Sequence, residues 1–450
     1  MKQLGYIRIF FQALIFPLLP YKKRKKIQKK RLKKLVRHVK ANSPYFARLY
    51  KDIGEDFNLS DLPITTKEMM MENFDEWITD SSINWIQVDE FKRDKSNIGH
   101  RIKNKYMVAE TSGSTGYPAT MLHDKTHQNV ESVLSFLRAL RFRLPICCIC
   151  VDDDFGVFNG TVRQNAIRYP FVKKFMRIIN AKKHPQQMVE ELNEFKPGVV
   201  IGYPGTLELL TDEAYKAKLK IKPSLVLVSG EYLSDMTRAK LEKTFGCPVR
   251  SIYASTEGGT MAFECRYNRM HINEDWCILE PVDEENRPVA MGERSSKVLL
   301  TNLSNFTQPI IRYELTDRVI IHDEPCPCGK KGLWLEVEGR TSDVLYFRSN
   351  GIKIGVAPMS LADTIEVIPG VRNFQVVLHP NNEIELRLVC MKNADPAETF
   401  QRVKQRVTEY LYEFGISDFS IYLSKDPPRL HPKSGKFKQI YQIDGGAQDQ

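Results

Sequence analysis

Residues 198–228, GVVIGYPGTLELLTDEAYKAKLKIKPSLVLV, contain two short apolar runs separated by a longer segment with the spacing of a helix. β-branched and other apolar residues fill the runs 199–201 and 225–228, and the helical pattern covers residues 206–219. A connection of this length lets both strands run in the same direction, with the helix packed on the sheet. The segment therefore predicts one strand–helix–strand unit of a parallel sheet.

The same alternation continues on both sides of this unit. The run 146–151, ICCICV, is apolar throughout, and the run 249–253, VRSIY, follows a helical pattern over residues 235–245. We expect these runs to be adjacent strands of one sheet, within a region of such units from about residue 106 to residue 321. Shorter strands, which indicate a β-rich subdomain, are expected at 299–302, near Arg312 and at 318–322.

The pattern changes after Gly339, where a second fold is expected. The runs 374–378 and 383–390 flank the turn sequence HPNN as a hairpin, and Asp395, followed by Pro396, caps a helix that precedes a further strand at 418–423. The sequence thus predicts an α/β protein of three regions: a helical region packed on the main body (1–105), a core (106–340) and a small α+β domain (341–450).

Composition and charge exclude several classes of protein. The 450 residues are 42% hydrophobic and 27% charged, which is typical of a globular chain and excludes collagen-like, coiled-coil and wholly disordered proteins. The formal net charge is +11, but residues 22–40 hold twelve Lys or Arg and no acid. Removing those twelve from the 66 Lys and Arg leaves 54, against 55 Asp and Glu, so nothing indicates general nucleic-acid binding.

The first forty residues admit two interpretations. Residues 4–19 are apolar but too short to span a bilayer, which takes about 20 residues, and no signal-peptide cleavage site follows them. With the basic run, they match a helix lying in a membrane interface. Alternatively, apolar residues at helical spacing indicate amphipathic helices packed on the main body, namely Leu32, Leu35, Val36 and Val39. The chain has nine cysteines, three of them in the apolar run 146–151, and this predicts a location in the reducing cytoplasm. A peripheral position at the inner membrane surface is the alternative location.

A glycine-rich hydroxyl loop, TSGSTGYP at 111–118, lies near the start of the predicted core. Its two glycines let the backbone curl, and its amides and hydroxyls can surround phosphate oxygens. No lysine follows the second glycine, so the loop differs from the Gly-Lys-Ser/Thr phosphate loop. On its own it could equally be a Ser/Thr-rich surface turn.

Four further motifs follow in order: YASTE at 253–257, RYELTD at 312–317, GRTSD at 339–343 and PKSGK at 432–436. With the hydroxyl loop they resemble the five motifs of the adenylate-forming superfamily. The resemblance implies a large ATP-binding domain with parallel-rich sheets and a small mobile C-terminal domain. It also implies ATP and Mg²⁺ as partners, with Thr256 on a phosphate, Glu257 on magnesium and Lys436 stabilising the adenylation transition state.

The resemblance implies a set of nucleotide-binding residues as well. Asp317 would hold the ribose hydroxyls, and Arg340 the ribose or a phosphate. The full set is Thr111, Ser112, Gly113, Ser114, Thr115, Gly116, Ser229, Gly230, Glu231, Tyr253, Ala254, Ser255, Asp317 and Arg340. The chemistry agrees, because attack of a carboxylate on the α-phosphate builds negative charge that needs a metal ion, hydrogen-bond donors and a cation.

Within the superfamily, the chain resembles the branch of phenylacetate–CoA ligases and CapK-type capsule-biosynthesis proteins. Ala119 stands where most of the superfamily has a loop lysine, as is common in this branch, whereas Thr316 replaces a usual Gly and Ser342 a usual Asp. The implied function is activation of a carboxylic acid as an acyl adenylate, followed by transfer to the thiol of CoA or a carrier protein. Alternatives are an adenylyltransferase that leaves AMP on its acceptor, and a silent partner in polysaccharide biosynthesis.

Two further sets of residues are candidates for a metal site and for the acid-binding pocket. Cys265, His271, Cys326 and Cys328 form a possible tetrahedral zinc set, which would be structural because every ligand is a protein group; a buried metal-free cluster is the alternative. The acid is expected near residues 152–160 and near Tyr203, Pro204 and Gly205, each set following a predicted strand. The sequence does not identify the acid.

Overall fold

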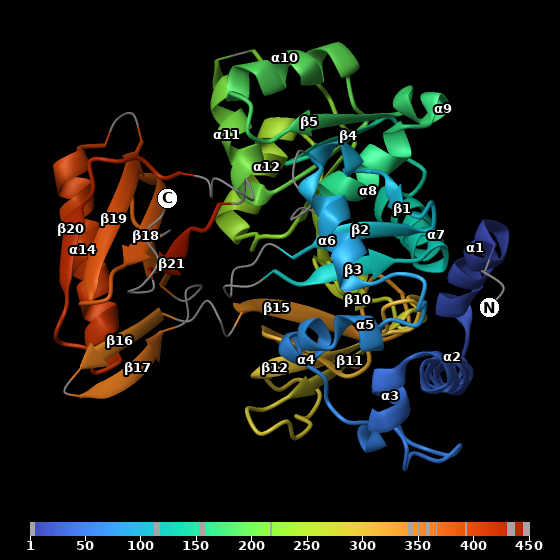
Figure 1. Ribbon diagram of the computed structural model, residues 1–450. Coiled ribbons are helices and arrows are strands. Elements are labelled where there is room, and N and C mark those ends of the chain that lie inside the picture. The colour runs from blue at the N-terminus through green and yellow to red at the C-terminus, as the bar shows by residue number, and fades with distance from the viewer. Residues whose placement is uncertain are drawn as a thin grey trace. The chain divides into compact units, whose positions relative to one another are not determined.

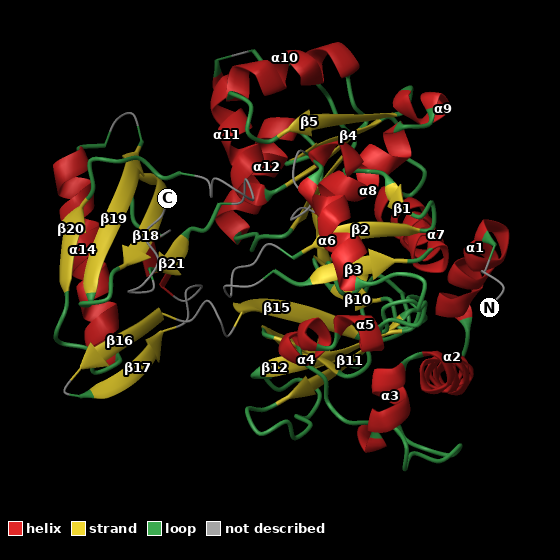
Figure 2. Ribbon diagram, viewed as in Figure 1, coloured by secondary structure: helices red, strands yellow, loops and turns green. Residues whose placement is uncertain are grey.

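The computed structural model describes residues 5–111, 118–152, 158–216, 218–340, 345–349, 351–356, 361–362, 364–365, 367–391, 394–429 and 437–443. The chain forms two compact units, Met1–Val337 and a second that begins at Glu338. Helices and strands alternate through most of the first unit, and the second has one long helix and a small sheet (Figures 1 and 2).

Helices open the first unit. They are α1 (Tyr6–Ile15), α2 (Tyr21–Asn42), α3 (Pro44–Leu49), α4 (Lys67–Glu72), α5 (Phe74–Trp77) and α6 (Trp85–Arg93). Leu32, Leu35, Val36 and Val39 on α2 are all buried, in one cluster with residues of the strands of the first unit. Within the described part of the chain, no helix is both long and apolar enough to cross a bilayer.

A nine-stranded sheet forms the centre of the first unit, in the order β14-β15-β10-β9-β8-β7-β6-β4-β5. Five consecutive strands of this sheet run parallel to one another: β4 (Ile146–Cys150), β5 (Met176–Asn180), β6 (Val199–Gly202), β7 (Leu225–Ser229) and β8 (Val249–Ser255). The expectation that the runs at 146, 199, 225 and 249 are adjacent strands is therefore confirmed.

The helices before and between these strands cover the sheet. They are α7 (Lys125–Leu134), α8 (Phe158–Ile167), α9 (Pro170–Lys173), α10 (Pro185–Phe195), α11 (Pro204–Tyr215) and α12 (Asp235–Phe245). Apolar residues of α7, α10, α11 and α12 share one buried cluster with the parallel strands. Helix α11 begins earlier than the predicted residue 206 because the Glu231 carboxylate accepts a hydrogen bond from the Gly205 N–H and so satisfies the first turn.

The remaining strands of the first unit are antiparallel or short, as the β-rich expectation predicts. They are β1 (Arg101–Ile102), β2 (Tyr106–Glu110), β3 (Thr120–His123), β9 (Gly259–Glu264), β10 (Met270–Ile272), β11 (Cys277–Val282), β12 (Lys297–Asn302), β13 (Tyr313–Leu315), β14 (Asp317–His322) and β15 (Trp334–Arg340). Strands β1–β3 and β11–β13 form two separate three-stranded sheets.

The second unit has its own core. Its elements are β16 (Leu345–Ser349), β17 (Ile352–Val356), β18 (Val371–Leu378), β19 (Glu383–Cys390), α14 (Pro396–Glu413), β20 (Ser420–Leu423) and β21 (Ile440–Gln442). The predicted hairpin is β18–β19, and the Asp395 side chain accepts a hydrogen bond from Glu398 N, as expected of an N-cap. Strand β20 extends the sheet parallel to β19.

Candidate active site

The candidate site lies at the carboxyl ends of the parallel strands. Strands β4, β6, β7 and β8 run in one direction, so the residues that follow them meet at one edge of the sheet. Asp152, Tyr203, Gly230 and Thr256 follow these four strands. Two positions of the expected acid pocket, Asp152 and Tyr203, and two of the expected nucleotide site, Gly230 and Thr256, are therefore gathered at a single edge.

Tyr253 and Asp317 are brought together although three strands separate β8 from β14 in the order of the sheet. The Tyr253 hydroxyl donates to Asp317 Oδ2 over 2.9 Å, and both residues are buried. The sheet must curl for these residues to meet. As a result, the first residue of β14 reaches the end of β8, where Asp317 can accept hydrogen bonds from a diol.

The turn between β8 and β9 carries Thr256 and Glu257. Thr256 Oγ1 contacts the Glu110 carbonyl at 3.4 Å, which places this turn beside the residue that precedes the hydroxyl loop. Asn302 Nδ2 donates to the Glu257 carbonyl at 3.1 Å and thereby holds the main chain of the turn. Glu257 itself is buried. The sequence alone gave no reason to connect Asn302 with this site.

The neck of the hydroxyl loop is closed by a pair of hydrogen bonds. Thr111 N donates to the Ala119 carbonyl over 2.9 Å, and Ala119 N donates to Thr111 Oγ1 over 2.8 Å. Lys92 from α6 lies at the same neck, in an ion pair with Glu110 and 2.9 Å from Thr120 Oγ1. A cation thus lies on Thr120, the residue after Ala119, and Ala119 is the position at which the motif that this loop resembles has a lysine. Sequence reasoning missed Lys92 because its partners lie in a distant strand pair.

Glu231, one of the expected nucleotide-binding residues, contacts the expected acid pocket. Gly230 has φ +83°, a conformation that favours glycine, and the Glu231 carboxylate accepts the Gly205 N–H at 2.9 Å. At the next strand, Asp152 accepts hydrogen bonds from Gln164 and Asn180. Both oxygens of the Asp152 carboxylate are therefore hydrogen-bonded to side chains of the same unit.

Several predicted residues lie outside the described part of the chain. They are Ser112, Gly113, Ser114, Thr115, Gly116, Lys436, residues 153–157 of the expected acid pocket and the hinge residues 341–343, and the side chains of residues 158, 159 and Arg340 are likewise not described. Thr111, Ser229, Gly230, Glu231, Tyr253, Ala254, Ser255, Thr256, Glu257 and Asp317 are described.

Glu131 lies behind the Thr256–Glu257 turn and was not predicted. The carboxylate of this α7 residue accepts hydrogen bonds from Thr260 N at 2.8 Å and from Thr260 Oγ1 at 2.7 Å. Gly259 has φ +65°, and a Cβ there would lie 2.4 Å from Glu131 Oε1, so only glycine fits. Burial raises the pKa of Glu131 to about 7, against the opposing effect of the Thr260 hydrogen bonds.

The four predicted metal ligands converge at the far end of β9 from this turn. The ligand atoms of Cys265, His271, Cys326 and Cys328 all lie within 4.8 Å of one another. The Cys265 and Cys326 Sγ atoms are 3.7 Å apart, close to the ~3.8 Å edge of a tetrahedron with Zn–S bonds of about 2.3 Å. Cys328 Sγ is 3.2 Å from His271 Nε2.

The electrostatics of two of the four ligands suit a metal ion, whereas burial raises the pKa of the Cys326 thiol to about 11. Burial, together with the charges of Lys330 and Arg269, lowers the pKa of His271 to about 4, so the imidazole is neutral. Burial opposes ionisation of Cys265, but hydrogen bonds from the backbone N–H groups of Tyr267 and Arg269 outweigh it and lower the pKa of this thiol. Neutral imidazole and thiolate are the forms that bind zinc.

Comparisons with known proteins agree with this arrangement. No family model matches the chain. It is 22% identical to Protein CapK of Staphylococcus aureus over 87% of this chain and 83% of that protein. It is also 22% identical to phenylacetate-coenzyme A ligase of Thermus thermophilus, over 86% of this chain and 85% of that protein.

A solved structure shares the fold. The crystal structure of 2-hydroxyisobutyryl-CoA ligase in the postadenylation state matches with a TM-score of 0.70 at 18% identity, covering 94% of this chain and 90% of that one. The fold of the chain is thus that of the adenylate-forming CoA ligases, as the five motifs implied.

The cysteine–histidine cluster gives a prediction about metal content. We expect protein purified without added metal to contain one zinc ion per chain, measured by plasma mass spectrometry, because the four ligand atoms already fit a tetrahedral site. Cys326→Ser should lose the zinc and lower the melting temperature, whereas Cys390→Ser, in the second unit, should keep it. Metal-free wild-type protein of the same stability as Cys326→Ser would contradict the assignment.

Glu131 gives a prediction about pH. Because its pKa rises from 4.5 in its ordinary state to about 7 in the fold, the stabilisation it contributes is complete below about pH 4.5 and is lost as the pH rises through about 7. Between pH 5 and pH 8, wild type should therefore lose up to about 3 kcal/mol of unfolding free energy relative to Glu131→Gln, measured by urea denaturation.

The matched control is Glu190→Gln, at an exposed position of α10. Its unfolding free energy should follow that of wild type across the same pH range. A difference between wild type and Glu131→Gln that stays constant with pH would show that Glu131 does not titrate in this range.

Proposed function

We propose that the chain is an AMP-forming acid–thiol ligase, which activates a carboxylic acid with ATP and transfers the acyl group to the thiol of CoA or of a carrier protein. The observation that carries this proposal is the meeting of Tyr253 and Asp317 beside the Thr256–Glu257 turn, at the carboxyl edge of the parallel sheet. The likeness to CapK and to phenylacetate-coenzyme A ligase supports it.

In the first step, an oxygen of the acid attacks the α-phosphorus of ATP, and the bond to the departing pyrophosphate breaks. Asp317 would orient the nucleotide by accepting hydrogen bonds from both ribose hydroxyls. The Tyr253 hydroxyl, which donates to the Asp317 carboxylate, would hold that carboxylate in place. Thr256 would donate to a phosphate oxygen. Lys436 would add a positive charge where negative charge develops.

Glu257 fits a magnesium site. Its carboxylate belongs to a turn whose main chain is fixed by Asn302, and carboxylate oxygen is a ligand that magnesium prefers. Bound magnesium would neutralise charge on the phosphates. The zinc proposed at Cys265, His271, Cys326 and Cys328 would be structural, because it leaves no position open for a substrate.

In the second step, the thiol sulfur bonds to the acyl carbon, the bond from that carbon to the AMP oxygen breaks, and the thiol proton is released. The two steps need different groups around the same acyl adenylate. A chain of two separate compact units suits such a sequence, with the second unit serving as a mobile lid.

A screen for pyrophosphate release tests the proposal. Full-length protein would be given ATP, magnesium and a panel of aryl, fatty and sugar-linked acids, each with and without CoA. Acid-dependent pyrophosphate followed by free AMP and an acyl thioester supports the ligase. AMP retained on the acceptor would instead identify an adenylyltransferase, and no pyrophosphate with any acid would favour a silent partner.

Asp317 gives a prediction about nucleotide choice. Asp317→Asn should lower kcat/KM for ATP by roughly 10- to 100-fold, since it loses charge-assisted hydrogen bonds to the ribose. The preference of wild type for ATP over 2′-deoxy-ATP should shrink in this variant. Asp323→Asn, at an exposed position just after β14, is the control and should behave as wild type. An unchanged preference in Asp317→Asn would remove Asp317 from the ribose site.

A further inference from the structure

Helix α1 is apolar on both of its faces. Ile9 and Ala13 are buried in the cluster that includes α7, whereas Ile7, Phe11 and Leu14 point outward with exposures of 73%, 56% and 50%. These three positions are spaced i, i+4 and i+7, so they share one face of the helix. A surface helix of a globular protein normally presents polar residues outward, whereas this outward face of α1 is apolar.

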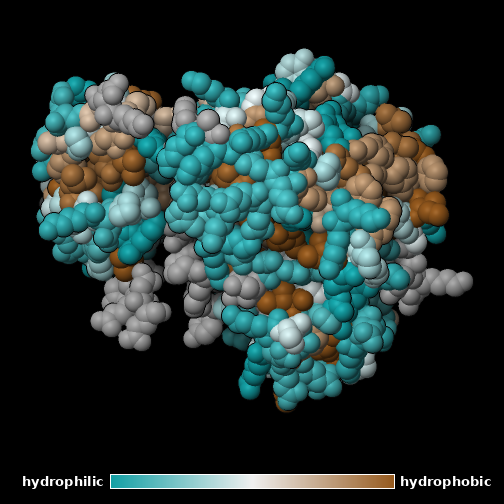
Figure 3. Space-filling view, turned by 90° about the horizontal axis from the view of Figure 1, so that it is seen from above, coloured by the Kyte–Doolittle hydropathy of each residue, from teal (hydrophilic) through white to brown (hydrophobic). Residues whose placement is uncertain are grey.

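The apolar surface continues past the end of α1. Leu18 is 72% exposed and Tyr21, at the start of α2, is 60% exposed. In Figure 3, apolar residues gather at the right-hand end of the molecule, the end at which Figure 1 places α1 and α9. An outward apolar strip of this kind marks an interaction site.

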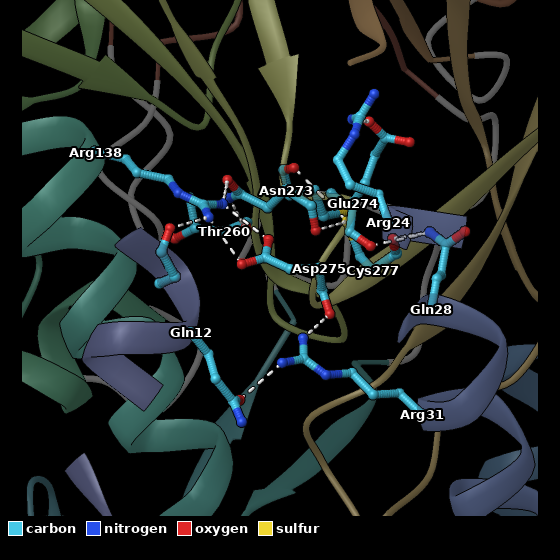
Figure 4. A network of polar contacts seen from close by, with 12 residues as sticks. Gln12, Arg24, Gln28, Arg31, Arg138, Thr260, Asn273, Glu274, Asp275 and Cys277 are labelled. Atoms are coloured by element: carbon cyan, nitrogen blue, oxygen red, sulfur yellow. Dashed lines mark hydrogen bonds and ion pairs between the residues drawn. The ribbon is translucent and has the colours of Figure 1, made fainter. Parts of the chain in front are cut away.

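A buried polar network fixes which face of α2 is turned inward (Figure 4). Arg24 forms an ion pair with Glu274 at 2.6 Å, and Gln28 donates to the carbonyls of Glu274 and Cys277. Arg31 donates to the Asp275 carbonyl and, at 2.9 Å, to Gln12 Oε1 of α1. These bonds tie α2 to the segment between β10 and β11 and leave the opposite face of the helix outward.

The outward face of α2 is strongly basic. Lys22, Lys26 and Lys30 are exposed and follow one another at i+4 spacing, opposite Arg24 and Gln28. None of these three lysines forms an ion pair with the described residues of the chain. The first acidic residue of the sequence is Asp52, so no carboxylate in this segment neutralises them.

We propose that α1 and the outward face of α2 bind the surface of an anionic lipid bilayer. The exposed side chains of Ile7, Phe11, Leu14 and Leu18 would enter the interface, and Lys22, Lys26 and Lys30 would contact acidic head groups. The combination of an apolar strip with adjacent unpaired lysines is the chemistry that such a surface recognises. The inference is independent of the proposed ligase activity.

Charge disfavours the other partners. A second copy of the chain would bring two clusters of unpaired lysines together, and like charges facing each other oppose association. A nucleic acid would match the lysines but would leave the apolar side chains of α1 in water. An anionic bilayer satisfies both features at once.

Vesicle flotation tests the proposal with the full-length protein. Vesicles of phosphatidylcholine alone would be compared with vesicles that also contain phosphatidylglycerol, at low and high salt. We expect binding only to the anionic vesicles, weakening as salt screens the lysines. Lys22→Glu/Lys26→Glu/Lys30→Glu should bind at least on the order of 100-fold more weakly, at ~1 kcal/mol per lysine removed from the surface.

Two further variants complete the test. Ile7→Gln/Phe11→Gln/Leu14→Gln should lose vesicle binding while remaining folded, since only exposed side chains change. Lys243→Glu/Lys404→Glu/Lys425→Glu carries the same change of net charge at exposed positions elsewhere and should bind as wild type. Three results would each overturn the proposal. Wild type could bind neutral vesicles as well as anionic ones, or the control with Lys243, Lys404 and Lys425 changed to Glu could lose as much vesicle binding as the variant with Lys22, Lys26 and Lys30 changed. The third result is a wild-type dimer that dissociates only when Ile7, Phe11 and Leu14 are changed to Gln.

Discussion

The parallel run β8-β7-β6-β4-β5 is the constraint on which the candidate site depends. Parallel strands must all end at the same edge, and their helical crossovers return the chain to the opposite edge each time. Segments that are about a hundred residues apart in the sequence, from Asp152 to Thr256, are thereby delivered to one place. Their side chains then need only short turns to face a common substrate.

The antiparallel strands of the sheet bring further residues to the candidate site. The sheet curls beyond β8, so Asp317 at the start of β14 reaches the Tyr253 hydroxyl at 2.9 Å. Buried carboxylates support this region from behind: Glu131 holds Thr260, and Asp275 is fully buried in an ion pair with Arg138 at 2.8 Å. Removing one partner of such a buried ion pair strongly destabilises the fold, because the other charge is left buried without a partner. The pair therefore favours the arrangement of the surrounding chain that keeps both partners together.

Sequence reasoning succeeded where the signal was local or repeated. The apolar runs predicted the parallel strands, Asp395 predicted the cap of α14, and the spacing of Cys265, His271, Cys326 and Cys328 predicted a cluster that the fold does bring together. It missed Lys92, Glu131 and Asn302, because each acts on a partner more than ten residues away. The spacing of apolar residues predicts which face of a helix is buried. It does not predict which turn of the chain packs against that face.

The edge of the parallel sheet is where we propose that the acyl adenylate forms. The most direct test of this proposal uses an acid that releases pyrophosphate with this protein, labelled with ¹⁸O in both carboxylate oxygens. Attack of the carboxylate on the α-phosphorus would leave one labelled oxygen on the AMP after thiol transfer, and mass spectrometry of the product would detect it. We expect AMP with one ¹⁸O atom. Unlabelled AMP, or ADP as the nucleotide product, would rule out an acyl-adenylate intermediate.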